Sequence, residues 1–309
     1  MRCLYDILPD CIGSEETSFG LPLPDYLAEH VPTGIPRGMI SLLFAESGNF
    51  KTTIKANIVD HVLDQGFTVL DYSLEDAANL IGAMRLSRVS GIPYARVVSG
   101  KLDEAELRAL QKACKDSIPS RRHIVVEEGE LTPNLSNIEM LVRKVKAEGE
   151  LDLVSIDYAQ LIDFSHVFCD SADRRGLEEV VKRLQSVAKE LNFAVLLVSQ
   201  VSRERILARK NKRPTMKDLF GSSFLEFGCK LAIAAYRPWN YGDEEYESFA
   251  KTYSDKAYES LLELWIRKNR FGRTNVCTRC VVELPTGRVQ SFDNAEELEL
   301  TDVDKEIGY

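Results

Sequence analysis

Short apolar runs alternate with amphipathic stretches along most of this chain. The runs that read as buried strands cover residues 39–45, 67–74, 123–127, 151–157 and 193–200. Between them, apolar residues recur at helical spacing over residues 54–63, 77–90, 102–116, 135–148 and 175–191. Strands that alternate with helices at this spacing predict an α/β fold with a doubly wound, mainly parallel sheet.

The pattern changes in the last third of the chain. Residues 231–236 predict one more strand, and two further strands, 261–267 and 276–282, flank the segment Lys268–Thr274. Because this segment is short and contains a glycine, the two strands are expected to form a β-hairpin that carries cations at its turn.

Composition limits the classes of protein that need to be considered. The 309 residues are 44% hydrophobic and 28% charged, as in ordinary soluble domains. The sequence has no apolar run long enough to cross a membrane and no secretory signal. Its seven scattered cysteines suit a reducing cytosol, so a cytoplasmic location is expected. Cys277 and Cys280 form a lone C-x-x-C that is more typical of packing thiols than of a metal site.

A polar turn after the first strong strand is a candidate phosphate-binding loop. It leads into Lys51 and Thr52 at the start of a helix, where backbone N–H groups would face an anion, Lys51 would reach the outer phosphates and Thr52 would hold Mg²⁺. The general pattern G-x-x-x-x-G-K-[ST] is not met, because Ala45 and Phe50 occupy its glycine positions. The alternative is an ordinary strand–loop–helix with a surface lysine. The expected nucleotide contacts are Ser47, Gly48, Asn49, Phe50, Lys51, Thr52 and Thr53.

Three further polar residues end predicted strands. Glu75, Asp157 and Gln200 follow apolar runs, and the carboxyl ends of parallel strands share one edge of a sheet. Asp157 is placed to hold the magnesium together with Thr52, and Gln200 to hydrogen-bond a γ-phosphate. The alternatives are a helix-dipole role for Glu75 and a turn-capping role for Asp157.

A basic segment, residues 201–213, stands out in a chain of net charge −9. Cations gathered there predict contact with a nucleic-acid backbone, because Lys and Arg displace the counterions of a polyanion. The alternative is a solvated, mobile loop. The candidate contacts in this segment are Arg203, Arg205, Arg209, Lys210, Lys212 and Arg213.

Several short motifs occur together in one order. They are Ser73-Leu-Glu75, Ile156-Asp-Tyr-Ala-Gln-Leu161, Ala188-Lys-Glu-Leu-Asn192 with Val198-Ser-Gln200, Lys212-Arg-Pro214 with Asp218-Leu219, and Lys268-Asn-Arg-Phe-Gly272. In this order the chain resembles the ATPase domain of DnaB-type replicative helicases, which are RecA-like hexameric motors. The resemblance covers roughly residues 17–285.

The resemblance implies ATP and Mg²⁺ as cofactors, single-stranded DNA as a partner, and a homo-oligomer, expected to be a hexamer. It implies that Glu75 is the catalytic base, and that Lys268 and Arg270 act on the ATP of the neighbouring subunit. In the segment that corresponds to the family's DNA-contact loop, only Ser222 matches, and Phe220 is expected to stack on a base.

The resemblance also suggests a division of the chain. Residues 1–16 are expected to form an arm or linker, residues 17–290 a RecA-like ATPase domain, and residues 291–309 an acidic tail. Nothing corresponds to the family's large N-terminal domain, which suggests a minimal, phage-like or plasmid-like form. The resemblance places the chain in the cytoplasm of a bacterium or of a phage-infected host cell. The tail resembles segments that dock a polymerase or primase, the alternative being a solubilising tail.

Two other functions remain open at this point. One is a non-unwinding helicase loader or recombination mediator that forms ATP-gated rings or filaments. The other is a regulatory RecA-like ATPase that acts on protein and binds no DNA.

Overall fold

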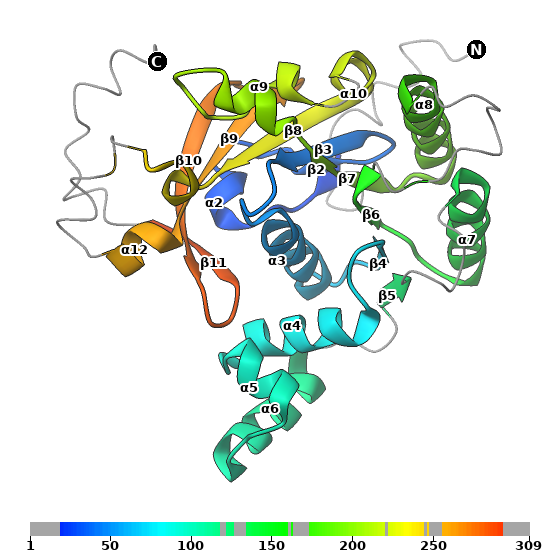
Figure 1. Cartoon of the computed structure of the whole chain (residues 1–309). Helices are drawn as coiled ribbons and strands as arrows, with labels where there is room; N and C mark the ends of the chain where they lie inside the picture. The colour runs from blue at the N-terminus through cyan, green and yellow to red at the C-terminus, as the bar shows by residue number, and fades with distance from the viewer. Residues whose placement is uncertain are drawn as a thin grey trace.

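The computed structural model describes residues 19–117, 122–126, 134–159, 162, 173–219, 222–243, 246 and 255–292. These residues form a nine-stranded sheet with the strand order β11-β10-β9-β8-β3-β7-β6-β4-β5. Figure 1 shows helices on both faces of this sheet, with a smaller group of helices, α4, α5 and α6, projecting from one end. Among the described residues, no helix combines the length and the apolar character that crossing a membrane requires.

The strands divide into a parallel and an antiparallel part. The parallel strands are β3 (Ile40–Ala45), β4 (Val69–Ser73), β5 (His123–Val126), β6 (Leu153–Asp157), β7 (Ala194–Gln200) and β8 (Cys229–Tyr236). The antiparallel strands are β9 (Leu261–Asn269), β10 (Val276–Glu283) and β11 (Arg288–Ser291). The prediction of a doubly wound, mainly parallel sheet with a C-terminal β-hairpin is therefore confirmed.

Helices cover the two faces unequally. One face carries α2 (Asp25–Ala28) and α3 (Lys51–Asp64), beside a separate two-stranded sheet of β1 (Gly20–Leu21) and β2 (Ile35–Pro36). The other face carries α7 (Leu135–Glu148), α8 (Asp173–Leu191) and α10 (Ser222–Gly228). The remaining helices are α4 (Ala78–Ser90), α5 (Tyr94–Ser99), α6 (Glu104–Ser117), α9 (Arg203–Leu207), α12 (Asp255–Ser260) and the 3₁₀ turns η2 (Met216–Asp218) and η3 (Pro238–Tyr241).

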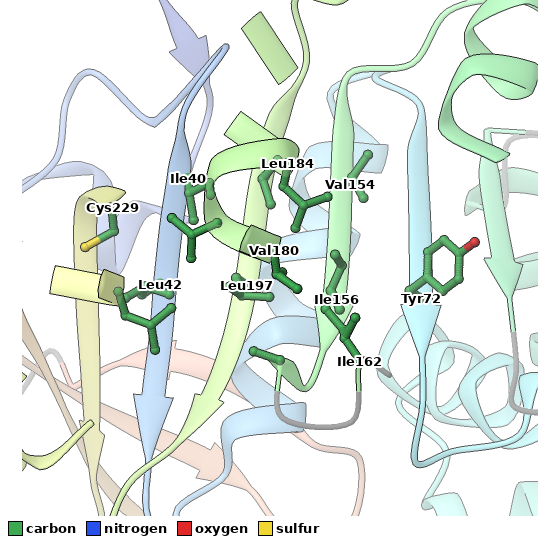
Figure 2. Packing of buried hydrophobic residues seen from close by; sticks show 14 of the residues in the cluster. Ile40, Leu42, Tyr72, Val154, Ile156, Ile162, Val180, Leu184, Leu197 and Cys229 are labelled. Carbon is green, nitrogen blue, oxygen red and sulfur yellow. The ribbon is translucent and has the colours of Figure 1, made fainter. Parts of the chain in front are cut away.

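The period of two along a strand explains the two cores. In β3, Ile40 and Leu42 face the layer of α7 and α8, whereas Leu43 faces α3, and all three are fully buried. Figure 2 shows Val180 and Leu184 of α8 lying against the sheet in the first of these cores. Since β3 is buried on both faces, its sequence is apolar at every position except the buried Ser41, rather than alternating.

The segment after β7 differs from its sequence prediction. The basic residues 201–213 are not one loop, because the helix α9 begins at Arg203, three positions after Gln200. Their last part turns back toward η2, where Asp218 caps the turn through the N–H and hydroxyl of Thr215.

Candidate nucleotide site

The phosphate loop joins the end of β3 to the start of α3. Phe50, the residue before the helix, has φ 58° and ψ 23°, which is the left-handed conformation. Glycine adopts this conformation at no steric cost, whereas other residues lose about 1–2 kcal/mol in it. The backbone here therefore has the shape that the missing glycine would permit, and Phe50 adopts it.

Asn49 holds the loop in this shape. Its side chain is buried, and the amide nitrogen donates to the carbonyls of Glu46 and Ser47, at 3.3 Å in both cases. Its amide oxygen accepts the backbone N–H of Arg237 at 2.8 Å. Asn49 was predicted to contact nucleotide, but its side chain faces the protein and not the cavity described next, and Thr53 does not line that cavity either.

A cavity of about 420 Å³ opens beside the loop at the carboxyl edge of the parallel strands. It brings together seven of the residues that the sequence predicted. The lining residues are Ser47, Gly48, Phe50, Lys51, Thr52, Glu75, Tyr158, Gln200 and Arg237. The loop after β3 and the carboxyl ends of β4, β6, β7 and β8 thus all contribute to one pocket, as the rule for open α/β sheets requires.

Tyr158 and Arg237 are the two lining residues that the sequence did not predict, and Arg237 also contacts the loop. Its guanidinium lies 4.4 Å from the ring centroid of Phe50, and its Nε donates to the carbonyl of Glu259 at 3.0 Å. Burial lowers the pKa of Arg237, although Glu259 opposes the shift. A signal was present, because Arg237 directly follows β8 at the same edge of the sheet as Gln200.

The charges of the pocket are mutually dependent. Lys51 Nζ donates to the carbonyl of Glu46 at 3.0 Å. Burial lowers the pKa of Lys51, and Asp157, Glu75 and Glu46 oppose this shift. Burial also raises the pKa of Glu75, and the neighbouring carboxylates of Asp157 and Asp76 raise it further.

Asp157 lies beneath the loop, with its side chain 4% exposed. Burial raises its pKa, while Lys55 and a hydrogen bond from Thr52 lower it. A hydroxyl and a carboxylate are oxygen donors of the kind that Mg²⁺ prefers. Within the described ranges no cluster of three His, Cys, Asp or Glu side chains suits a metal. The oxygen donors of Thr52 and Asp157 would fit a Mg²⁺ that takes its remaining ligands from phosphates and water.

Lys268 and Arg270 do not reach this pocket. In the sheet register, Lys268 pairs with Ala232 near the start of β8, and the start of β8 lies beside the start of β3. Ala232 pairs with Leu42 of β3, and the phosphate loop leaves β3 after Ala45, three residues or about 10 Å farther along the strand. Lys268 Nζ instead donates to the carbonyl of Glu226, and Arg270 is exposed.

The predicted DNA-contacting residues occupy different environments. Arg203 and Arg205 project from α9, where Arg203 pairs with Glu46 and Arg205 donates to the carbonyl of Lys217. Lys210 is exposed, and Lys212 donates to the carbonyl of Leu207 at 2.7 Å. Phe220 lies outside the described residues, and of Ser222 the structure describes only the backbone, at the start of α10.

Arg213 must be removed from the candidate DNA-contacting surface. Its side chain is 5% exposed and donates to both carboxylate oxygens of the buried Glu263, at 2.7 and 2.8 Å. Its guanidinium also lies over the ring of Tyr236 at 4.9 Å. Arg209 is half-buried and paired with Asp218 at 2.9 Å, which leaves its guanidinium less available than those of α9.

A comparison with protein families matches residues 27–283 to the family model of the DnaB-like helicase C-terminal domain. The chain belongs to the DnaB-like helicase C-terminal domain family. The replicative DNA helicase DnaB of Helicobacter pylori is 25% identical over 259 residues, which are 83% of this chain and 52% of that protein. The replicative DNA helicase DnaC of Bacillus subtilis is 27% identical over 271 residues, 87% of this chain and 56% of that protein. The chain thus spans about half the length of these curated relatives.

Solved structures agree on the fold of this DnaB-like domain. One, an ATPase domain, superposes with a TM-score of 0.79 at 21% identity and covers 94% of this chain and 97% of its own. Another, a DnaB-like replicative helicase studied for its interactions with primase, gives a TM-score of 0.77 at 21% identity, covering 93% and 64%. The predicted resemblance to the DnaB-type motor domain is therefore confirmed.

Proposed function

We propose that this chain is an ATP-hydrolysing motor that assembles into a ring of identical subunits, expected to be a hexamer, and translocates along single-stranded DNA during replication. The observation that supports this most directly is the cavity in which Lys51, Glu75 and Gln200 meet at one edge of the sheet. Family membership supplies the reaction class, and the cavity supplies the groups that the reaction needs.

Each group has a distinct role in the proposal. Lys51 and the N-terminal turn of α3 hold the triphosphate. Thr52 and Asp157 hold Mg²⁺, which when bound offsets the charge of the phosphates. Glu75 accepts the proton of the attacking water, and Gln200 senses the γ-phosphate.

Lys268 and Arg270 act on the nucleotide of the adjacent subunit. Their position at the opposite edge of the sheet supports this assignment, because they cannot serve their own pocket. Exposed aromatic rings lie nearby: Phe227, next to Glu226, is 78% exposed, and Phe271 is in edge contact with Phe19 at 4.6 Å. An exposed apolar surface beside two cations is what a contact between subunits would use.

DNA binding is assigned to the exposed cations after β7. Gln200 and the first of these, Arg203, are separated by two residues, so a change at the γ-phosphate has a short path to α9. This supports coupling between nucleotide state and DNA grip.

The deciding experiment measures the ATPase rate with and without single-stranded DNA, together with oligomer mass by light scattering under the same conditions. We expect DNA to stimulate hydrolysis in an oligomer, and Lys51→Ala to abolish hydrolysis without changing the mass. A monomer that hydrolyses ATP at full rate would refute the ring.

Two further assays separate the rival functions. Strand displacement on forked DNA distinguishes a helicase from a loader or recombination mediator, which would bind and hydrolyse without unwinding. Oligonucleotide titration at several salt concentrations tests the regulatory alternative, because phosphate contacts must weaken as salt rises.

The acidic tail, residues 291–309, is proposed to dock a polymerase or primase, and all but its first two residues lie outside the described part of the chain. A chain ending at residue 292 should keep DNA-stimulated hydrolysis and lose co-elution with the replication partner. Unchanged co-elution would leave the tail a solubilising role.

A further inference from the structure

A row of buried charges lies directly beneath the nucleotide pocket. Lys55, one turn after Lys51 on α3, is 2% exposed. Its Nζ lies 3.1 and 3.2 Å from the two carboxylate oxygens of Asp71 on β4, and 3.7 Å from Oδ2 of Asp157 on β6. His123, at 3.7 Å from the other side of Asp71, ends the row.

This arrangement is not explained by stability. Transfer of charged groups from water to the interior costs several kcal/mol for each ion, and apolar side chains of similar volume often serve a fold as well or better. The residues next to Lys55 in the core, Ile54 and Ile58, are apolar and fully buried. Lys55 thus occupies a position where an apolar residue would complete the core.

The geometry links the row to the predicted magnesium site. Asp157 is contacted from two sides by α3, through the hydroxyl of Thr52 and the ammonium of Lys55. Lys55 is itself fixed by its two bonds to Asp71, so it cannot turn away from Asp157 without breaking them. The carboxylate is therefore tied to the same helix that carries Lys51.

We propose that Lys55, anchored by Asp71, is a positioning residue that orients the Asp157 carboxylate for Mg²⁺. The proposal rests on the nucleotide site proposed above. The charges of Lys55 and Asp71 cancel, so Asp157 remains the net anion that a divalent cation would meet. Partners that orient a metal-binding carboxylate commonly change metal affinity about 10–100-fold when removed.

The test uses the full-length chain and a fluorescent ADP, titrated once in EDTA and once over a range of Mg²⁺ concentrations. The paired variant Lys55→Met with Asp71→Leu removes both charges and leaves neither buried alone. We expect the half-saturating Mg²⁺ concentration to rise about 10–100-fold, while ADP affinity in EDTA changes less than about twofold. The control pair, Arg37→Met with Asp152→Asn, removes an ion pair at the far edge of the sheet and should shift neither value.

A second variant covers the case in which the paired variant does not fold. Asp71→Asn keeps the volume and frees Lys55 to pair with Asp157 alone, where it competes with Mg²⁺, so the half-saturating concentration should again rise. An unchanged Mg²⁺ midpoint in a folded variant, or an equal loss of ADP affinity in EDTA, would overturn the positioning role. If the wild-type chain binds no ADP at all, it is the proposed function that fails, independently of Lys55.

Discussion

Arg203 Nε lies 3.2 Å from Oε1 of Glu46, an ion pair that ties the first helix after β7 to the phosphate loop. The guanidinium is 75% exposed and the carboxylate only 11%. The other carboxylate oxygen of Glu46 accepts the hydroxyl of Tyr241 at 2.6 Å, and its carbonyl accepts Lys51 Nζ. A candidate DNA-contacting cation and the candidate nucleotide-binding lysine therefore share one residue.

DNA phosphates would compete with Glu46 for Arg203. We expect Glu46→Gln, which keeps an acceptor for Tyr241, to raise affinity for a single-stranded oligonucleotide in the absence of nucleotide by about two- to fivefold, the range of an exposed ion pair. Fluorescence anisotropy at low and high salt measures this. Glu204→Gln, on the same helix, controls for the change in net charge and should have a smaller effect. Equal effects of the two variants would show that the ion pair does not restrain Arg203.

Arg270→Ala should abolish ATP hydrolysis without dissolving the assembly, because an arginine acting in trans contributes on the order of 10³–10⁵ in rate. Arg273→Ala, which alters an exposed cation of the same turn, should retain most of the activity. The sharper measurement mixes Arg270→Ala with Lys51→Ala. In mixed rings, the intact nucleotide pocket of an Arg270→Ala subunit can face the intact Arg270 of a Lys51→Ala subunit. ATPase activity should therefore return in part. If the mixture stays inactive while the oligomer mass is normal, Arg270 does not act across subunits.

The pocket could be predicted from the sequence because several of its residues stand at the ends of predicted strands. Glu75, Asp157 and Gln200 follow apolar runs, and parallel pairing alone brings such ends to one edge. Position in sequence did not distinguish Arg213 from Arg203, although one is buried and the other exposed. That difference depends on Glu263 of β9, an antiparallel strand whose placement beside β8 comes from tertiary pairing and not from local pattern.

The same limit applies to Lys55. A lysine on the inner face of α3 interrupts the apolar pattern, and the sequence alone gives no reason for it. The reason is the pairing with Asp71 on the neighbouring strand β4, which only the tertiary structure shows. Arg237 could not be predicted for a different reason. The phosphate-loop pattern concerns the loop residues alone, and it does not indicate which distant side chain packs on Phe50.

The left-handed backbone at Phe50 makes a prediction about stability. Phe50→Ala loses the ring and keeps the unfavourable conformation, whereas Phe50→Gly loses the ring and relieves it. The glycine variant should therefore be more stable than the alanine variant by about 1 kcal/mol in urea unfolding. Ala56, inside the helix α3, serves as the control. There alanine should be more stable than glycine, and Ala56→Gly should lower the free energy of unfolding by about 0.5–1 kcal/mol. Alanine and glycine variants of equal stability at position 50 would contradict the observed φ.

The pH dependence of hydrolysis should report on Glu75. A catalytic base acts in its ionised form, and burial, Asp157 and Asp76 all raise the pKa of Glu75 above its ordinary value of 4.5. The rate should therefore fall as pH falls, with an acidic midpoint above that value. Asp76→Asn removes one of the like charges without touching the base, so it should move the midpoint to lower pH.

Steady-state rates between neutral and acidic pH measure both midpoints, and circular dichroism at each pH separates titration from unfolding. The pKa of Glu75 depends on Asp76. If the midpoint stays the same in a folded Asp76→Asn protein, Glu75 is therefore not the group that titrates.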